Sequence, residues 1–240
     1  MDIKLRRREA LALLAASLVA PGAASAQAEG LKIGTVGSGR LGKALGTLWI
    51  KAGHNVMFSS RHPDQLKDMA AALGPKASTG TPAEAAAFGD AVLVAVPYGA
   101  MEQVGRDLAG IWRGKPVLDA GNAVAPRDDP AIMEAVSRRG IGVVAREMLP
   151  GAHVVRVFNT MGAAKFAALG FRGRRIGMPL AGDDRQAVQV PDRLVRDIGF
   201  ERVLVGGLDR ARLFQQREPF WQAAQEELSA AELRKRLPPS

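Results

Sequence analysis

Three glycines spaced as G-x-G-x-x-G give the strongest chemical signal in the sequence. The run reads Gly37, Ser38, Gly39, Arg40, Leu41 and Gly42. It follows an apolar segment at residues 31–36, where the first glycine permits a tight turn, the second lets the backbone approach a pyrophosphate, and the third lets a helix pack closely on a strand. The helix that begins there offers free N–H groups to the phosphates. The sequence therefore predicts a dinucleotide-binding loop.

The residues after the second expected strand distinguish NADP(H) from NAD(H). An NAD site needs an acidic residue about 20 residues beyond the glycines, to bind the ribose 2′-hydroxyl. Here the sequence has Ser59, Ser60 and Arg61 instead. Serine hydroxyls can donate to a 2′-phosphate, and Arg61 can bind it by charge-assisted hydrogen bonds, with Arg40 as a second cation. These residues favour NADP(H).

Candidate acids and bases are few. The chain has one tyrosine, three histidines and no cysteine, which excludes thiol catalysis and cysteine-ligated zinc. His54 and His153 are expected at the sheet edge opposite the ligand, with His54 as a solvated turn residue, and His62 lies beside the expected adenosine phosphate. Tyr98 is interpreted as a packed aromatic, with a role as proton donor or stacking partner as the alternative. No metal-spaced pair of histidines occurs, so no metal site is predicted and no catalytic residue is assigned.

This shortage of acids bears on the acceptor. Reduction of a ketone requires a positioned acid to protonate the developing alkoxide. Hydride transfer to a flavin-like ring requires less, because the ring delocalises the charge and the protein chiefly holds two rings in contact. The sequence thus favours a flavin or deazaflavin acceptor. Reduction of an imine or carbonyl, with water or Tyr98 as the acid, is a weaker alternative.

Apolar runs alternate with helical segments along the chain. Strands are expected at residues 31–36, 56–59, 91–96, 117–120, 154–158, 175–181 and 202–205, and helices at 41–52, 63–73 and 184–198, with a short helical turn from Thr81. Asp183 and Asp184 are expected to cap the last of these helices. The alternation predicts an α/β protein with a Rossmann-type, doubly wound, mostly parallel sheet and helices on both faces.

The two ends of the chain differ from the middle. Residues 1–26 have a basic start, an apolar run and an Ala-Ser-Ala site, which predicts an export signal removed after Ala26. Arg7 and Arg8 resemble a twin-arginine signal, which predicts a periplasmic protein; the general secretory route and an uncleaved membrane anchor are the alternatives. Residues 27–217 form the expected Rossmann domain, without a transmembrane helix. Residues 218–240 are expected as a helical tail; a solvated terminal helix is the preferred interpretation, and packing on the core or contact with a partner are the alternatives.

Composition limits the class of partner. The chain has 240 residues, 47% hydrophobic and 24% charged, with a net charge of +9. This excludes a disordered chain and favours an anionic ligand. Aromatic residues make up only 5%, and no helix-turn-helix or zinc motif accompanies the positive charge, so nucleic acid is not an expected partner.

Several motifs in order resemble one family. Beyond the glycine loop and the serine–arginine pair, they are Val96-Pro97-Tyr98, Asp119-Ala120-Gly121-Asn122, residues 154–160, residues 181–184 and residues 206–212. Together they are similar to the coenzyme F420-dependent NADP oxidoreductases, to which the N-terminal domain of the STEAP metalloreductases is related. The resemblance implies contacts with the ribose and nicotinamide from Val96, Pro97, Ala100, Asn122 and Ala163, and places Leu208 near the deazaflavin. It also implies a homodimer.

Two function classes remain open. The first is an NADPH-dependent oxidoreductase that passes hydride between NADP(H) and a flavin-like, deazaflavin or other small-molecule acceptor. The second is a non-catalytic NADP(H)-binding sensor, or a docking module for a membrane redox partner. The lack of acids and bases fits both classes, and turnover of NADPH separates them.

Overall fold

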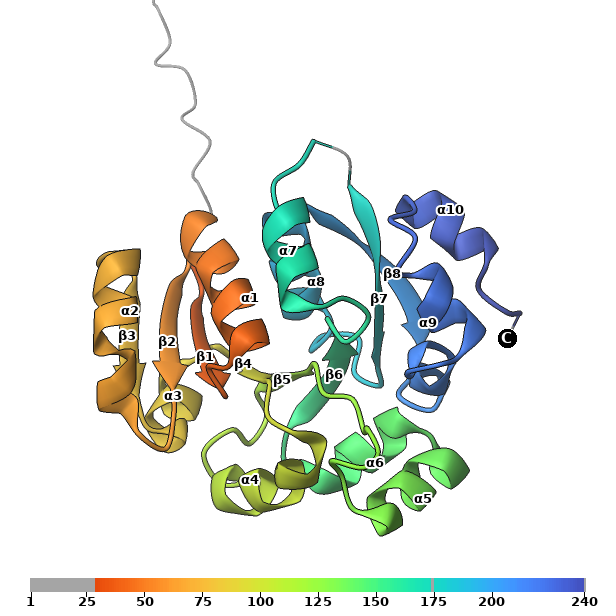
Figure 1. The fold of residues 1–240 in the computed structure, drawn as a ribbon, viewed down its shortest axis with the longest axis horizontal. Coiled ribbons are helices and arrows are strands. Elements are labelled where there is room, and N and C mark those ends of the chain that lie inside the picture. Colours follow the sequence, from red (N-terminus) through yellow and green to blue (C-terminus); the bar gives the residue numbers. More distant parts are fainter. Residues whose placement is uncertain (1–28, 174, 240) are drawn as a thin grey trace, which may run out of the picture.

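The structure is a computed structural model that describes residues 29–173 and 175–239 (Figure 1). The expected export signal lies outside these residues and stays a prediction. In the described part, one eight-stranded sheet has the order β3-β2-β1-β4-β5-β6-β7-β8, with helices packed on both faces. The predicted fold class is confirmed.

The elements follow the chain in this order. The strands are β1 (Lys32–Val36), β2 (Asn55–Ser59), β3 (Ala77–Gly80), β4 (Ala91–Val94), β5 (Pro116–Asp119), β6 (His153–Val157), β7 (Ile176–Gly182) and β8 (Phe200–Gly206). The α-helices are α1 (Arg40–Lys51), α2 (Lys67–Leu73), α3 (Pro82–Phe88), α4 (Met101–Leu108), α5 (Pro130–Arg139), α6 (Ile141–Met148), α7 (Ala163–Leu169), α8 (Gln189–Asp197), α9 (Pro219–Ala223) and α10 (Ala230–Lys235). Three short 3₁₀ helices are η1 (Pro63–Leu66), η2 (Tyr98–Ala100) and η3 (Arg210–Phe214).

The strand order fixes where a ligand can bind. β1 lies between β2 and β4 in parallel register, so Val36 pairs with Ser59 on one side and Val94 on the other. The chain winds outward from β1 through β2 to β3 and then crosses to β4 on the opposite side. Ligands of open α/β sheets bind at such a switch point, outside the carboxyl ends of the strands. Among the strands of residues 29–173 and 175–239, the only antiparallel pair joins β6 to β7.

Apolar residues of the central strands belong to two hydrophobic clusters, one on each face of the sheet. Ile33 and Leu93 belong to the first cluster, with α1, α7 and α8, whereas Val36 and Val94 belong to the second, with α3, α4 and α6. A parallel strand covered on both faces has this near-continuous apolar sequence. Helices cover both faces of the sheet, so a ligand is left with the carboxyl ends of the strands.

Local differences from the sequence predictions have simple causes. β3 was not predicted, because its sequence Ala-Ser-Thr-Gly carries little apolar signal. The expected helix at 63–73 is divided into the 3₁₀ helix η1 and the α-helix α2. The first residues of the expected helix at 184–198 form a turn, and α8 begins only at Gln189. The Asp184 carboxylate accepts hydrogen bonds from Gln186 N (2.7 Å) and Ala187 N (3.1 Å), so it caps the turn that precedes α8. The N-cap of α8 itself is Val188, and Asp183 accepts from the Leu208 N–H, so the prediction that these two residues cap the helix is corrected.

The prediction of a solvated tail is wrong. Helices α9 and α10 lie beside β7 and β8 (Figure 1), and Phe220, Ala230 and Leu233 are buried in a third cluster with Val203 and other residues of this region. The Gly177 N–H donates to the Leu228 carbonyl at 2.8 Å. Apolar side chains three apart on α10 face the sheet, so the segment completes the core.

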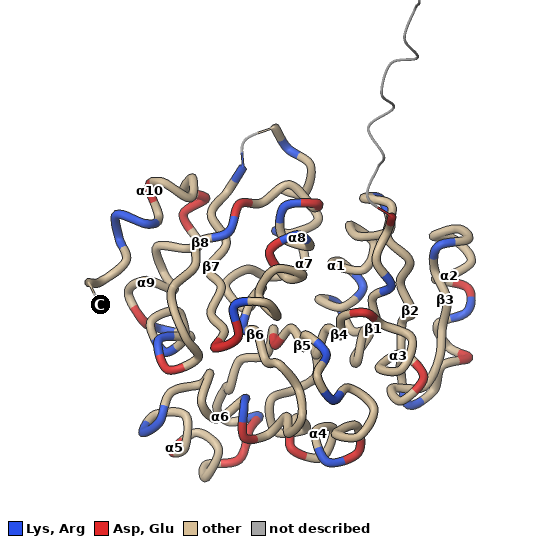
Figure 2. The backbone as a smooth tube through the Cα atoms, turned by 180° about the vertical axis from the view of Figure 1, so that it is seen from behind, with Lys and Arg blue, Asp and Glu red and all other residues tan. Residues whose placement is uncertain are grey.

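Charged residues of both signs are distributed over the whole fold (Figure 2). Lys and Arg residues are interspersed with Asp and Glu over many elements, so the positive net charge is spread widely (Figure 2). Among the described residues, none of the helices has the length and apolar character that crossing a membrane requires.

Candidate functional site

The glycine loop has the tight turn predicted at Gly37, while Gly42 lets the helix approach the loop and not a strand. Gly37 has φ of 97°, and a Cβ there would lie 2.7 Å from the Ala95 carbonyl oxygen. A Cβ at Gly42 would lie 2.1 Å from the Gly37 carbonyl oxygen, so helix and loop touch. A Cβ at Gly39 would meet no protein atom within 4 Å. The space in front of Gly39 is therefore open to a ligand, as a pyrophosphate site requires.

The N-terminus of α1 is suited to an anion. The helix begins at Arg40, its N-cap residue Gly39 makes no side-chain cap, and its first turn holds no acidic residue. The first N–H groups of a helix have no intrahelical partner and carry a partial positive charge. The loop thus presents donors toward the open space at Gly39.

A groove of about 570 Å³ runs along the carboxyl ends of β1, β2 and β4. It contains nine of the predicted site residues: Gly37, Ser38, Gly39, Ser59, Ser60, Arg61, Val96, Pro97 and Ala100. Leu66 and Pro82 add an apolar wall, and α4 contributes Gln103, Val104, Asp107 and Leu108. The other predicted residues, Arg40, Leu41, Gly42, Asn122 and Ala163, do not line this groove. The term dinucleotide groove is used for it below.

The serines at and just after the end of β2, Ser59 and Ser60, differ in whether their hydroxyl protons are free. Ser59 is buried, and its hydroxyl donates to the Thr35 carbonyl at 2.6 Å. Its single proton is therefore used within the sheet, which corrects the expectation that Ser59 donates to a phosphate. The Ser60 Oγ accepts from the His62 N–H at 3.0 Å, which leaves the Ser60 proton free to donate.

Arg61 and Arg40 are exposed beside the groove and the glycine loop. Neither side chain makes a hydrogen bond or ion pair with the part of the chain that the structure describes. A free guanidinium is a strong ligand for phosphate oxygens, since it can donate two parallel hydrogen bonds. The end of the groove next to β2 thus holds uncommitted cations, and no carboxylate directly follows β2.

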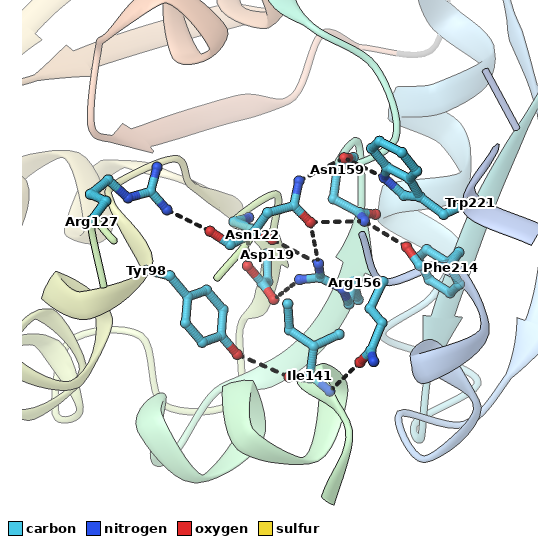
Figure 3. Close-up of polar contacts among 11 residues, drawn as sticks. Tyr98, Asp119, Asn122, Arg127, Ile141, Arg156, Asn159, Phe214 and Trp221 are labelled. Carbon is cyan, nitrogen blue, oxygen red and sulfur yellow. Dashed lines mark hydrogen bonds and ion pairs between the residues drawn. The ribbon is translucent and has the colours of Figure 1, made fainter. Parts of the chain in front are cut away.

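Asn122 lies farther along the sheet edge, in a network of side chains (Figure 3). Its Nδ2 donates to the Asn159 carbonyl at 2.8 Å, and its Oδ1 accepts from Arg156 Nη2 (3.1 Å) and Asn159 Nδ2 (3.3 Å). The protein therefore uses most of the hydrogen-bonding capacity of this amide. One N–H of Asn122 remains, and the residue is partly exposed.

Arg156 and Asp119 form the centre of this network. Both lie in motifs that carry the family resemblance, but the sequence assigned neither of them a role. Both side chains are 0% exposed, and Arg156 Nη1 lies 2.5 Å from Asp119 Oδ2. Arg156 Nη2 also donates to the Gly121 carbonyl at 2.7 Å, and Asp119 Oδ1 accepts from the Gly121 N–H at 2.8 Å. A lone cation inside the apolar run at 154–158 is the signal that could have indicated a buried partner.

Asp128 forms a second polar centre on the same loop. Its carboxylate accepts from Gly99 N (2.8 Å), Val124 N (2.8 Å) and Arg127 Nη2 (2.6 Å), and its side chain is 1% exposed. Burial opposes ionisation of Asp128, but these donors outweigh it and hold the pKa of the carboxyl below its ordinary value. Arg127 Nη2 also donates to the Asn122 carbonyl at 2.6 Å.

Tyr98 is a packed aromatic, as its preferred interpretation predicted. The side chain is fully buried, and its hydroxyl donates to the Ile141 carbonyl at 3.0 Å (Figure 3). Burial, assisted by the negative charge of Asp119, raises the pKa of the phenol. The alternative role of Tyr98 as an acid for an external substrate is not supported, because its proton is committed inside the core.

The histidines lie away from the expected nicotinamide. His54 is buried, which corrects the expectation of a solvated side chain: Nδ1 accepts from the Leu31 N–H and Nε2 contacts Asp197, both at 3.0 Å. Burial lowers the pKa of His54, against the opposing effect of Asp197. His153 begins β6 at the same sheet edge, and His62 is exposed beside Ser60.

Two residues expected near the acceptor lie outside the dinucleotide groove. Ala163 begins α7, shortly after Asn159. Leu208 is 1% exposed and packs in the second hydrophobic cluster, while its N–H donates to Asp183 Oδ1 at 2.8 Å. The structure thus brings together the predicted pyrophosphate and 2′-phosphate residues, with Asn122 in a separate network along the same edge.

The fold and the loop define a Rossmann-type dinucleotide-binding protein. Residues 32–123 match the model of a family described as NADP oxidoreductase coenzyme F420-dependent. This match covers the glycine loop, Ser60, Arg61 and Asn122, and it confirms the family resemblance found in the sequence. The family and the fold together indicate an NADP-dependent oxidoreductase-type Rossmann protein. The relation to the STEAP metalloreductases stays a prediction.

Solved structures agree on the fold. A hypothetical protein from Sinorhizobium meliloti is 27% identical, with a TM-score of 0.68, over 80% of this chain and 93% of its own. A putative F420-dependent NADP reductase from Arthrobacter is 23% identical, with a TM-score of 0.60, over 76% of this chain and 88% of its own. An imine reductase from Myxococcus stipitatus in complex with NADP⁺ is 17% identical, with a TM-score of 0.53, over 75% of this chain and 57% of its own. No curated protein matches the sequence.

Proposed function

We propose that this protein is an NADPH-dependent oxidoreductase that passes hydride between NADP(H) and a flavin-like or deazaflavin acceptor, with coenzyme F420 as the first candidate. The observation that carries the cofactor assignment is the combination, in one groove, of the open glycine loop, the free Ser60 proton and the unpaired Arg61 guanidinium. An anion-binding loop and a cationic site in the same groove suit a dinucleotide with a 2′-phosphate.

The acceptor assignment rests on the side chains near the carboxyl ends of the strands, where neither Tyr98 nor the histidines His54 and His153 can donate a proton to a substrate. Tyr98 turns its hydroxyl inward, and His54 and His153 lie at the opposite edge. NADPH itself supplies the hydride, so the chain needs to bind two rings in contact and exclude water. A ring that delocalises the incoming charge can accept hydride without a strong acid from the protein, whereas a ketone cannot.

The residues proposed for the nicotinamide end are few. Val96, Pro97 and Ala100 line the groove beyond the glycine loop. Asn122 has one remaining N–H, which is suited to a carbonyl oxygen of the ligand. Ala163, at the start of α7, is proposed to border the acceptor. All of these groups bind and orient, and none of them transfers a proton.

The test is consumption of NADPH by the purified protein. Loss of the reduced-nicotinamide absorbance would be followed with coenzyme F420, FMN, FAD or a ferric chelate as acceptor, and with NADH in parallel. Fast consumption of NADPH with one acceptor, and slow consumption of NADH, is the expected result. Tight binding of NADPH without consumption by any acceptor would contradict the enzyme proposal and favour the sensor or docking module.

Two further expectations accompany this proposal. We propose that residues 1–26 direct export by the twin-arginine route, so that replacing Arg7 and Arg8 by lysine should retain the protein in the cytoplasm. Full export of that variant would contradict the route. We also expect a homodimer, which sedimentation of the purified protein would test.

A further inference from the structure

The loop of residues 120–128, called the Asn122 loop here, connects β5 to the start of α5. It is held at its beginning by the buried Asp119–Arg156 pair, through both backbone groups of Gly121. It is held at its end by Asp128, whose N–H also donates to the Val124 carbonyl at 3.0 Å. The position of Asn122 is therefore set by two separate ionic centres.

Asp128 differs from the first centre because it reaches beyond its own loop. Its Oδ1 accepts the Gly99 N–H at 2.8 Å, while its Oδ2 accepts the Val124 N–H at 2.8 Å. Gly99 lies between Pro97 and Ala100, which line the dinucleotide groove. One carboxylate thus joins a wall of the groove to the Asn122 loop.

The surroundings of this carboxylate leave it little freedom. The side chain is 1% exposed, and a Cβ at Gly99 would lie 3.3 Å from Asp128 Oδ1. Arg127 compensates the buried charge and donates to the Asn122 carbonyl at 2.6 Å. A buried carboxylate with charge-assisted bonds holds its partners more firmly than neutral groups do.

We propose that Asp128 is a positioning residue of the dinucleotide site, whose carboxylate sets the distance between the groove wall at Pro97–Gly99–Ala100 and the Asn122 loop. This inference rests on the proposed function, since it assumes that the nicotinamide lies between these two segments. In the described part of the chain, the hydrogen bonds and ion pairs of Asp128 join it to Gly99, Val124 and Arg127 and not to the glycine loop or Arg61, so its influence is confined to the nicotinamide end. The adenosine end is bound by residues that Asp128 does not contact.

The test compares Asp128→Asn with Asp129→Asn. In the first variant an NH₂ group replaces one carboxylate oxygen, so either Gly99 or Val124 loses its acceptor. In the second, the same change falls on the neighbouring N-cap of α5, where the side chain accepts only from Ala131 N and asparagine caps equally well. Affinities for NADPH and for adenosine 2′,5′-bisphosphate, which represents only the adenosine end, would be measured by calorimetry.

We expect Asp128→Asn to weaken NADPH binding by about tenfold, the effect of one lost charge-assisted hydrogen bond, and to leave binding of the bisphosphate within about twofold. Asp129→Asn should leave both affinities unchanged. Equal weakening of both ligands would overturn the proposal, because general damage to the fold acts on both ends. No change in either affinity would also overturn it.

A second variant covers the case in which Asp128→Asn does not fold. Arg127→Met keeps both backbone bonds of the Asp128 carboxylate and removes the contact with the Asn122 carbonyl, so we expect a loss of about two- to threefold for NADPH alone. Equal or absent losses for the two ligands would again overturn the proposal. Failure of the wild-type protein to bind NADPH at all would overturn the proposed function together with this inference, a result distinct from either variant outcome.

Discussion

The two ends of the proposed site, for adenosine and for nicotinamide, are built in opposite ways. At the adenosine end, Arg61, the Ser60 proton and the first turn of α1 have no protein partner in the described chain and face open space. At the nicotinamide end, Asn122, Arg156 and their neighbours bind one another. The adenosine end thus has free donors and cations that can bind a ligand, whereas the side chains at the nicotinamide end are held in place by one another.

The difference follows from what each end must bind. Phosphates are strongly hydrated anions, so free cations and N–H groups provide affinity for them. A nicotinamide ring must be held in one orientation for hydride transfer, and misplacement is costly. Polar groups that satisfy one another are rigid, which suits orientation more than affinity. Variants at the two ends should therefore have different effects, some on stability and some on binding.

The largest effect is expected from the buried ion pair. Arg156→Met leaves the Asp119 charge without a partner at 0% exposure and should lower the free energy of unfolding by about 3–5 kcal/mol. Urea unfolding would measure it. The double variant Asp119→Leu/Arg156→Met is the control and should recover part of the loss, because no buried charge remains although both backbone groups of Gly121 lose their partners. A double variant as unstable as Arg156→Met would contradict this account.

A change at the adenosine end should act on binding and not on stability. Arg61→Ala removes the unpaired guanidinium and should weaken NADPH binding by about 10- to 100-fold, while binding of NADH, which lacks the 2′-phosphate, is unchanged. Arg113→Ala, at an exposed arginine outside the groove, is the matched control. If the ratio of NADPH to NADH affinity is the same in Arg61→Ala as in the wild type, the assignment of Arg61 is wrong.

Ser59 and Ser60 are adjacent in the chain, but their substitution by alanine should have different effects, one on stability and one on binding. Ser59→Ala removes a buried hydrogen bond to Thr35 and should cost about 1 kcal/mol of stability, with the preference for NADPH unchanged. Ser60→Ala should leave stability nearly unchanged and weaken NADPH binding about two- to fivefold. Thermal unfolding and calorimetry on both variants would measure this contrast. A reversed pattern would show that the hydroxyls have the opposite roles.

The smallest effect concerns pH at the nicotinamide end. The pKa of Asp128 in the folded state lies below its ordinary value, so its contribution to stability is present above about pH 4 and is lost as pH falls through the lowered pKa. The difference in unfolding free energy between the wild type and Asp128→Asn should be constant near neutral pH and shrink in acid. A difference that grows in acid would contradict this sign.

The adenosine end could be predicted from the sequence because its residues are adjacent in the chain. Gly37, Gly39 and Gly42 follow a strand directly, and Ser60 and Arg61 follow the next one, so local spacing was sufficient. The nicotinamide end joins Asp119 to Arg156 and Asn159 to Phe214, pairs that only the strand order brings together. These partners are 37 and 55 residues apart in the chain, so no local spacing predicts that they pair.

The same reasoning explains the errors about burial. Ser59 was predicted as a phosphate ligand from its position, but the direction of its hydroxyl depends on the neighbouring strand β1. His54 was placed correctly at the opposite edge, yet its burial depends on α8, which supplies Asp197. Segment 218–239 has apolar residues such as Phe220 and Leu233 at helical spacing, a pattern that would have predicted packing.

The involvement of the C-terminal segment has a consequence for synthesis on the ribosome. The groove lined by residues up to Leu108 is complete in sequence long before Phe214, whose carbonyl binds Asn159 Nδ2, has been added to the chain. Ribosomes add about 5–20 residues per second, so roughly one hundred residues separate the two events by about 5–20 s. A nascent chain should thus acquire the means to hold adenosine phosphates first, and the means to orient the nicotinamide only near the end of translation.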